Sequence, residues 1–509
     1  METSLRKKIG QLFMVGFDAL EVNEHITRMI LQYHVGGIIL FRRNVNTPEQ
    51  VAKLCRDLQE VNATVSDIPL LISIDQEGGM VMRVEHGVTP IPSAMAFQEA
   101  GSIQDCEQLS RISAEEMRQI GINMNLAPVL DVNNNPKNPV IGVRAYGEDP
   151  ATVIDYGMAA MRGIQSSGLV ATVKHFPGHG DTSADSHYAM PVVPHDRQRL
   201  DSIELPPFKA AIAQGVHAIM TAHVVFPAIE PEPNLPATLS KAVLTDLLRH
   251  ELGFNGVIIT DCLEMAAISD GVGVAKGAVA TLRAGADIVL VSHLEERQIA
   301  AIEAVVGAAE SAAIDVNDID RSVRRVQQLK QLDAVSAWRK LPATPHGLMR
   351  PEAMQLAQRV QAAALRVKGN FRPLPAELPL TLITVEMRSR TEVDEIGAAA
   401  RSSMLTALQN AGREVREHTL PFDASEQEVA NAIAYAKGAQ QIVLQTYNAV
   451  LSDGQQRLLA ELPHEKMWLV AGRLPYDLDL APNAQGRLAS FGCRPAALAP
   501  VVEKLLGVG

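Results

Sequence analysis

Short apolar runs rich in Val, Ile and Leu recur along the first 330 or so residues, with longer amphipathic stretches between them. Eight runs are strand candidates: 12–17, 36–41, 70–74, 122–130, 169–175, 217–223, 256–260 and 286–292. Because these runs are continuous and not alternating, they are typical of strands that helices cover on both faces. The spacers, such as residues 47–61 and 102–121, carry helical patterns.

Eight strands alternating with helices over about 300 residues predict a (β/α)₈ barrel. An open doubly wound sheet is the alternative, and it calls for a glycine-rich phosphate turn after an early strand. No GxGxxG or GxxxxGK[ST] follows any of the eight runs. The pattern therefore favours the barrel.

The apolar pattern breaks after the barrel and then restarts. Pro, Gly and polar residues cluster at 336–353, as in a linker, and strand candidates return at 380–385, 441–447 and 467–472. Helical stretches lie between the later strands, which predicts a smaller open α/β domain. We therefore expect a catalytic barrel at 1–335, a linker at 336–353 and a C-terminal α/β domain at 354–509.

Composition and charge narrow the class of partner. A formal net charge of −12 argues against a surface built for nucleic acid or an anionic membrane, since both need a basic patch. Four scattered cysteines without a CxxC pair are typical of reduced thiols in the cytoplasm. No stretch approaches eighteen uninterrupted apolar residues, and the apolar run near the N-terminus lacks a small-residue cleavage site. We expect a cytoplasmic protein with a small-molecule ligand.

Polar side chains gather where the predicted strands end. Segments 75–83 and 131–144 follow two strands, two further strands end at segments 221–223 and 260–265, and Lys174 and His175 end a fifth. Taken singly, each has an ordinary explanation: Arg144 as a surface residue, Asp261 as a helix N-cap, His223 as a buried structural histidine. In a barrel all these ends meet on one face, so the whole set favours a polar ligand site.

The densest segment, "KHFPGHGDTSADSH" at 174–187, has two chemical interpretations. His179, Asp181, Asp185 and His187 could bind a metal. Metal-dependent hydrolases on barrels generally begin with an HxH pair on the first strand, and neither that pair nor HExxH occurs.

Proton transfer fits this segment better. Asp185 and His187 are two residues apart, so in an extended segment both point to one face, and the carboxylate would raise the proton affinity of the imidazole. Gly178 and Gly180 would let the loop move. Lys174 and His175, still on the strand, would be rigid donors to ligand hydroxyl groups.

Five segments together resemble the bacterial β-N-acetylglucosaminidases of glycoside hydrolase family 3, over essentially the whole first domain. They are "IDQEGGMVMRV", "APVLDV", "VIGVRAYGEDP", "VKHFPGHGDTSADSH" and "ITDCLEM". The resemblance implies that Asp261 is a nucleophile forming a covalent glycosyl-enzyme, and that His187 is the general acid/base with Asp185 as its partner. It also implies that the −1 sugar is held by Asp75, Arg83, Arg144, Lys174 and His175.

The implied reaction retains β stereochemistry and needs neither a metal nor a cofactor. The implied substrate is a carbohydrate with terminal β-linked N-acetylglucosamine, from peptidoglycan fragments or chitin oligosaccharides. The second domain is similar to the C-terminal α/β domain of some Gram-positive members, with an open role in stability or in closing the cleft. Three residues depart from the family pattern: Cys262, where alanine is expected, and Met80 and Met82, where relatives commonly have "GGRVQR".

Other interpretations stay open at this stage. A β-glucosidase or a phosphate-using glycosidase of the same family is one, because an acid/base that is not anionic would tolerate phosphate. A metal-dependent hydrolase using the His/Asp loop is another, and a non-catalytic sugar-binding protein is a third.

Overall fold

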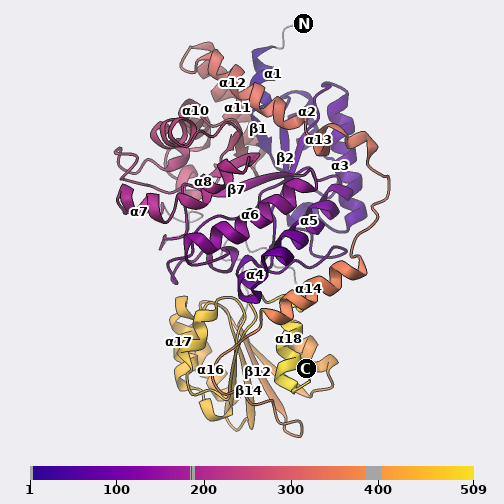
Figure 1. Ribbon diagram of the computed structural model, residues 1–509, viewed down its shortest axis with the longest axis vertical. Coiled ribbons are helices and arrows are strands. Elements are labelled where there is room, and N and C mark those ends of the chain that lie inside the picture. Colours follow the sequence, from indigo (N-terminus) through magenta and orange to yellow (C-terminus); the bar gives the residue numbers. More distant parts are fainter. Residues whose placement is uncertain (1–3, 184, 186–189, 386–402, 509) are drawn as a thin grey trace.

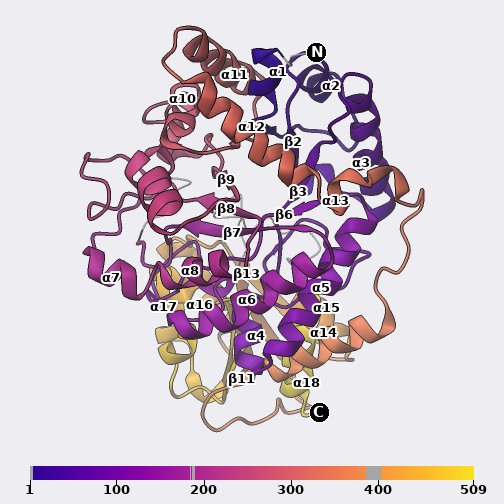
Figure 2. The ribbon, with the colours of Figure 1, turned by 45° about the horizontal axis from the view of Figure 1, so that its top comes forward.

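The computed structural model describes residues 4–183, 185, 190–385 and 403–508. Eight parallel strands form one sheet in the order β10-β1-β2-β3-β6-β7-β8-β9. They are β1 (Phe13–Val15), β2 (Gly37–Leu40), β3 (Leu71–Ile74), β6 (Met124–Asn125), β7 (Val170–Phe176), β8 (Ala218–Thr221), β9 (Val257–Ile259) and β10 (Val289–Val291). A parallel bridge between Ile259 and Ile288 brings the two edges together, so the sheet closes into the predicted barrel (Figure 2).

Every predicted strand overlaps an observed one, but one was predicted far too long. The run at 122–130 yields only β6, because Pro128 has no N–H to donate to a neighbouring strand. Pairing with β7 continues irregularly beyond it, where the Leu130 N–H donates to the Lys174 carbonyl (2.7 Å). This irregular end carries the segment that enters the functional site.

A helix follows each barrel strand and covers the outside of the sheet (Figures 1 and 2). In strand order these helices are α2 (Glu24–Leu31), α3 (Pro48–Ala63), α5 (Ile103–Gln119), α6 (Pro150–Ser166), α8 (Pro206–Ala213), η4 (Ala242–Glu251), α10 (Val274–Ala284) and α11 (Glu295–Glu310). Local sequence sets their starts: before α6, the Asp149 side chain accepts from the Thr152 N–H, and Pro150 takes the first helical position. Of the helices in the described ranges, none combines the length and apolar character that crossing a bilayer requires.

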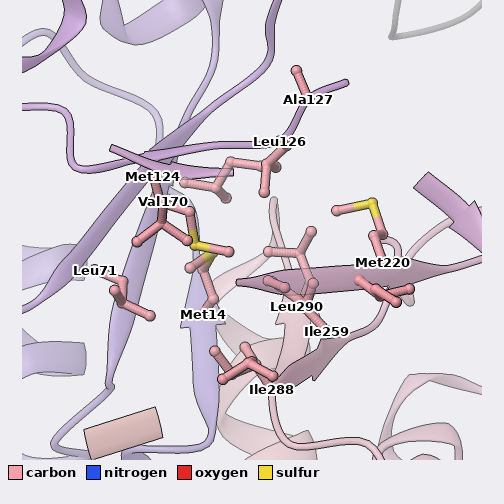
Figure 3. Packing of buried hydrophobic residues seen from close by; sticks show 14 of the residues in the cluster. Met14, Leu71, Met124, Leu126, Ala127, Val170, Met220, Ile259, Ile288 and Leu290 are labelled. Atoms are coloured by element: carbon pink, nitrogen blue, oxygen red, sulfur yellow. The ribbon is translucent and has the colours of Figure 1, made fainter. Parts of the chain in front are cut away.

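The barrel is filled by side chains. Figure 3 shows its interior packing, with Met14, Leu71, Met124, Val170, Met220, Ile259 and Leu290 among the labelled residues. These side chains come from seven different strands and are at most 3% exposed. The barrel is therefore a packed core, and a ligand can enter only at an end.

The C-terminal domain is a second sheet between two layers of helices. Its strands are β11 (Arg366–Val367), β12 (Leu380–Val385), β13 (Val415–Leu420), β14 (Gln441–Thr446), β15 (Met467–Ala471) and β16 (Gly486–Ala489), in the order β11-β16-β15-β14-β12-β13. Its helices include α15 (Ser403–Asn410), α16 (Glu426–Ala436), α17 (Asp453–Glu461) and α18 (Pro495–Leu506). Figure 1 shows α17 and α18 on opposite sides of this sheet, which is the predicted open α/β architecture.

Helix α14 (Pro351–Ala363) joins the two domains, and it begins inside the stretch expected to be linker. Its buried residues Leu356 and Val360 belong to the barrel core, whereas the neighbouring Ala364 belongs to the core of the C-terminal domain. The short helix α4 (Ala94–Ala100) lies at the same junction (Figure 1). The junction is therefore built from ordered helices.

Candidate active site

A cavity opens at the carboxyl ends of the barrel strands. Six of the eight residues predicted for the site line it: Asp75, Arg83, Arg144, Lys174, His175 and Asp261. They come from segments at the ends of β3, β6, β7 and β9. This is the end of a barrel where strand-end segments converge, and it is where barrel proteins bind small ligands.

Five charged residues form one connected group, the ion cluster. Lys174 Nζ lies 2.7 Å from Asp75 Oδ1 and 2.7 Å from Glu77 Oε1. Arg144 holds Glu77 through two bonds, Nε to Oε2 (2.9 Å) and Nη2 to Oε1 (2.8 Å). Arg83 Nη2 lies 3.7 Å from Asp75 Oδ2. Three cations against two carboxylates leave a surplus of one positive charge beside the cavity.

Two members of the ion cluster, Lys174 and Glu77, keep their charges near neutral pH. Burial alone would lower the pKa of Lys174, but the carboxylates of Asp75 and Glu77 raise it above its usual value. Burial alone would raise the pKa of Glu77, but Arg144 and Lys174 outweigh this effect and hold the pKa well below its usual range. Both partners stay ionised, so the cavity has a fixed charged wall able to hold ligand hydroxyl groups.

A buried aspartate orients the histidine that follows Lys174. His175 Nδ1 lies 2.7 Å from Asp131 Oδ2, and the His179 backbone N–H donates to Asp131 Oδ1 (2.7 Å). Burial raises the pKa of Asp131, but His175 outweighs it and the pKa is lowered overall. Because Asp131 is ionised, His175 Nδ1 carries a proton, and Nε2 is the nitrogen left to meet a ligand.

The start of the polar loop is anchored by its own hydrogen bonds. The Asn138 side-chain amide donates to the carbonyls of His179 (2.8 Å) and Gly180 (2.9 Å). A Cβ on Gly180 would lie 1.7 Å from the Val132 carbonyl oxygen, so glycine is required here for close approach and not for motion. Burial, together with nearby His175, lowers the pKa of His179 to about 4 and keeps it neutral.

Asp181, another of the four metal candidates in the loop, also contacts neighbouring side chains. Its Oδ2 lies 2.6 Å from His195 Nε2 and 3.5 Å from Arg199 Nη2. These contacts tie Asp181 to two residues that follow the polar segment, His195 and Arg199.

The predicted proton-transfer pair is only partly visible. Asp185 is 9% exposed, and its charge acts to raise the pKa of His179, which places the carboxylate near that ring. His187 lies outside the described residues, as do 184, 186, 188 and 189. The pairing of Asp185 with His187 therefore stays a prediction.

Asp261 follows β9 and lines the cavity. Its Oδ1 accepts from the Cys262 N–H (2.7 Å), and the next helix, α9 (Ala266–Ser269), begins only after Met265. The N-cap interpretation of Asp261 is therefore wrong. His223 is 1% exposed, and its Nε2 donates to the Cys262 carbonyl (2.9 Å), so it supports the main chain beside Asp261, as its structural interpretation predicts.

Sequence reasoning missed two charged residues of the site, Glu77 and Asp131. Asp131 carried a usable signal, because it follows its strand directly, as Asp75 and Asp261 follow theirs. Glu77 carried none, since it lies in an "EGG" triplet that is typical of a tight turn. Phe41 and His293 also line the cavity, from the ends of β2 and β10.

Comparisons with known proteins point the same way as this geometry. The model of the glycosyl hydrolase family 3 N terminal domain matches residues 4–329. A family 3 β-N-acetylglucosaminidase from Paenibacillus sp. str. FPU-7 is 45% identical, with a TM-score of 0.92 over 100% of this chain and 97% of that one. The solved relative therefore matches both domains, whereas the family model matches the barrel.

Curated relatives cover less of the molecule. Beta-hexosaminidase A of Pseudoalteromonas piscicida is 36% identical over 383 residues, which are 70% of this chain and 60% of that protein. A beta-hexosaminidase of Stenotrophomonas maltophilia (strain R551-3) is 36% identical over 290 residues, which are 56% of this chain and 84% of that protein. The chain thus spans less than two thirds of the length of the first relative and most of the second.

Proposed function

The chain belongs to glycosyl hydrolase family 3 and is a glycoside hydrolase of the β-hexosaminidase type, and from this premise we propose that it is a retaining exo-β-N-acetylglucosaminidase. Its substrates are carbohydrates with terminal β-linked N-acetylglucosamine, from peptidoglycan fragments or chitin oligosaccharides. The name of the Paenibacillus relative supports the N-acetyl sugar. Four free, buried cysteines support a reducing, cytoplasmic setting.

The observation that carries this proposal is that Asp261 lines one cavity together with four of the five residues of the ion cluster: Asp75, Arg83, Arg144 and Lys174. A glycosidase must hold the sugar and present a carboxylate to its anomeric carbon. Asp75, Arg83, Arg144, Lys174 and His175 hold the hydroxyl groups. Hydrogen bonds to neighbouring carboxylates fix the positions of Arg144, Lys174 and His175. The surplus positive charge of the ion cluster offsets the negative charge of Asp261, which favours the ionised carboxylate that the reaction needs.

The reaction proceeds in two displacements. Asp261 attacks the anomeric carbon and forms a covalent glycosyl-enzyme, while His187 donates a proton to the leaving oxygen. His187 then takes a proton from water, which attacks the same carbon and frees Asp261. Two inversions restore the β configuration. Asp185 supports the protonated imidazole of His187.

Turnover of an aryl β-N-acetylglucosaminide beside an aryl β-glucoside tests the sugar preference. We expect clear preference for the N-acetyl sugar, and equal turnover would favour the β-glucosidase alternative. An Asp261→Ala variant that keeps full activity would exclude Asp261 as nucleophile. Release of a sugar phosphate in phosphate buffer would show a phosphorylase, and loss of activity with a chelator that zinc restores would show a metal-dependent hydrolase.

His187→Ala separates an acid/base from a binding residue. Its rate should fall more with poor leaving groups than with good ones, because a good leaving group needs less protonation. An equal loss for all leaving groups would contradict the assignment. Comparing a β-linked N-acetylglucosaminyl muropeptide with chitobiose then identifies the natural aglycone class.

A further inference from the structure

The C-terminal domain contacts the two barrel segments that carry the arginines of the ion cluster. One segment is the hairpin of β4 (Gln76–Gly78) and β5 (Val81–Met82), which leads into Arg83. The other is residues 131–148, which carry Arg144. Each segment is held by a different residue of the C-terminal domain.

Tyr476 holds the segment with Arg144. It lies in η9 (Pro475–Leu480), where its hydroxyl donates to Glu148 Oε1 (2.5 Å) and accepts from Asn133 Nδ2 (3.0 Å). Asn133 Oδ1 in turn accepts from the Gly142 N–H (3.1 Å). One phenol hydroxyl therefore ties together both ends of the segment and, through Asn133, its middle.

The chain around Gly142 is fitted closely against the C-terminal domain. Gly142 has φ +49°, and a Cβ at this position would lie 2.8 Å from Leu474 Cδ2. Arg144 follows two residues later and donates to Glu77 within the ion cluster. A shift of Tyr476 or Leu474 would therefore reach Arg144 through two peptide units.

Arg494 holds the hairpin. Its Nη2 donates to the carbonyl of Met80 (3.1 Å), and its Nη1 pairs with Glu85 Oε1 (2.9 Å). Glu85 also pairs with Arg42 of the barrel (2.7 Å). Met80 is 1% exposed and packs in the core of the C-terminal domain with Phe491, which explains why an apolar residue replaces the polar one expected here.

The hairpin transmits this contact to the ion cluster. Gln76 Oε1 accepts hydrogen bonds from the backbone N–H groups of Arg83 (3.0 Å) and Val84 (3.2 Å). The hairpin that Arg494 holds therefore also positions the backbone of Arg83. Arg83 thus approaches Asp75, and Arg144 approaches Glu77, from two segments that are each fastened to the second domain.

We propose, resting on the proposed function, that the C-terminal domain positions the sugar-binding subsite, with Tyr476 and Arg494 as its positioning residues. Neither residue lines the cavity, and each acts through the barrel segment that it holds. Burial and the Glu148 carboxylate raise the pKa of Tyr476, so its hydroxyl stays protonated and remains a donor.

The test replaces Tyr476 by phenylalanine in the full chain. Tyr476→Phe should raise KM for an aryl β-N-acetylglucosaminide by about three- to tenfold and change kcat by less than about twofold, because ground-state and transition-state binding weaken together. Hydrogen exchange of the amides of residues 133–148 should quicken. The matched control is Tyr435→Phe, which removes a hydroxyl bound to the Glu417 carbonyl (3.0 Å) within the C-terminal domain and should alter neither readout.

Glu148 offers a second test from the barrel side. Glu148→Gln keeps an oxygen acceptor for Tyr476 and should behave nearly as the wild type, whereas Glu148→Ala should reproduce the rise in KM. Arg494→Ala should speed up amide hydrogen exchange in residues 76–85, and not in residues 133–148. Unchanged KM and exchange in Tyr476→Phe, or equal effects in Tyr435→Phe, would overturn the inference. A wild-type protein without turnover would refute the proposed function alone, because the exchange readout would still test the positioning.

Discussion

Replacing Glu77 by glutamine should destabilise the barrel strongly. The Glu77 side chain is 7% exposed and accepts two bonds from Arg144 and one contact from Lys174, both of which are also buried. Glutamine has nearly the same shape but no charge, and its amide N–H₂ group would face donors. The buried cations would then share only the carboxylate of Asp75.

The expected loss in the free energy of unfolding follows from this geometry. Breaking a buried ion pair by neutralising one partner costs about 3–5 kcal/mol, and glutamine keeps one acceptor oxygen, so we expect about 3 kcal/mol. With a urea m-value of about 3 kcal/mol/M or more for a domain of this size, the midpoint should fall by at most about 1 M. Far-UV circular dichroism in urea measures this shift.

The chain contains a matched control for burial. Arg6 and Glu303 form a pair that is also joined by two bonds (2.8 and 2.9 Å), but both side chains are well exposed, so Glu303→Gln should leave the midpoint unchanged.

The pKa of Glu77 is lowered in the fold, so its stabilisation is present above its unfolded pKa of about 4.3 and is lost as pH falls toward the folded value. The difference in urea midpoint between the wild type and Glu77→Gln should therefore become smaller at acid pH. Equal midpoints for the two glutamine variants at pH 7 would refute the reasoning.

Two further predictions follow from buried charges. Asp131→Asn should lower kcat/KM for the aryl substrate about tenfold, because the Nδ1 proton of His175 loses its ionised acceptor, and wild-type kinetics would contradict this role. Burial lowers the pKa of Lys330 to about 7, so the unfolded chain binds more protons and stability rises with pH between about 7 and 10. Lys330→Met should flatten that rise in thermal melts recorded from pH 7 to 10, and a slope equal to that of the wild type would exclude this cause.

The sequence predicted the barrel well because each barrel strand is covered on both faces. Such strands are continuous apolar runs in the sequence, whichever strands and helices lie next to them. In the C-terminal domain the same logic found β12, β14 and β15, which lie inside the sheet. It missed β11, β13 and β16: β13, the edge strand "VREHTL", is mostly polar and partly exposed, and β11 and β16 have only two and four residues.

The sequence by itself determined which polar residues stand at strand ends, and the barrel geometry then placed six of the predicted site residues around one cavity. Only the tertiary structure decided which charges pair, as Lys174 does with Glu77 and Asp131 with His175. It also showed that Met80 packs in the core of the C-terminal domain. The physical reason is the distance along the chain over which each effect acts. Hydrophobic periodicity reports burial, which each residue experiences locally, whereas an ion pair depends on where barrel closure and domain docking bring residues far apart in the chain.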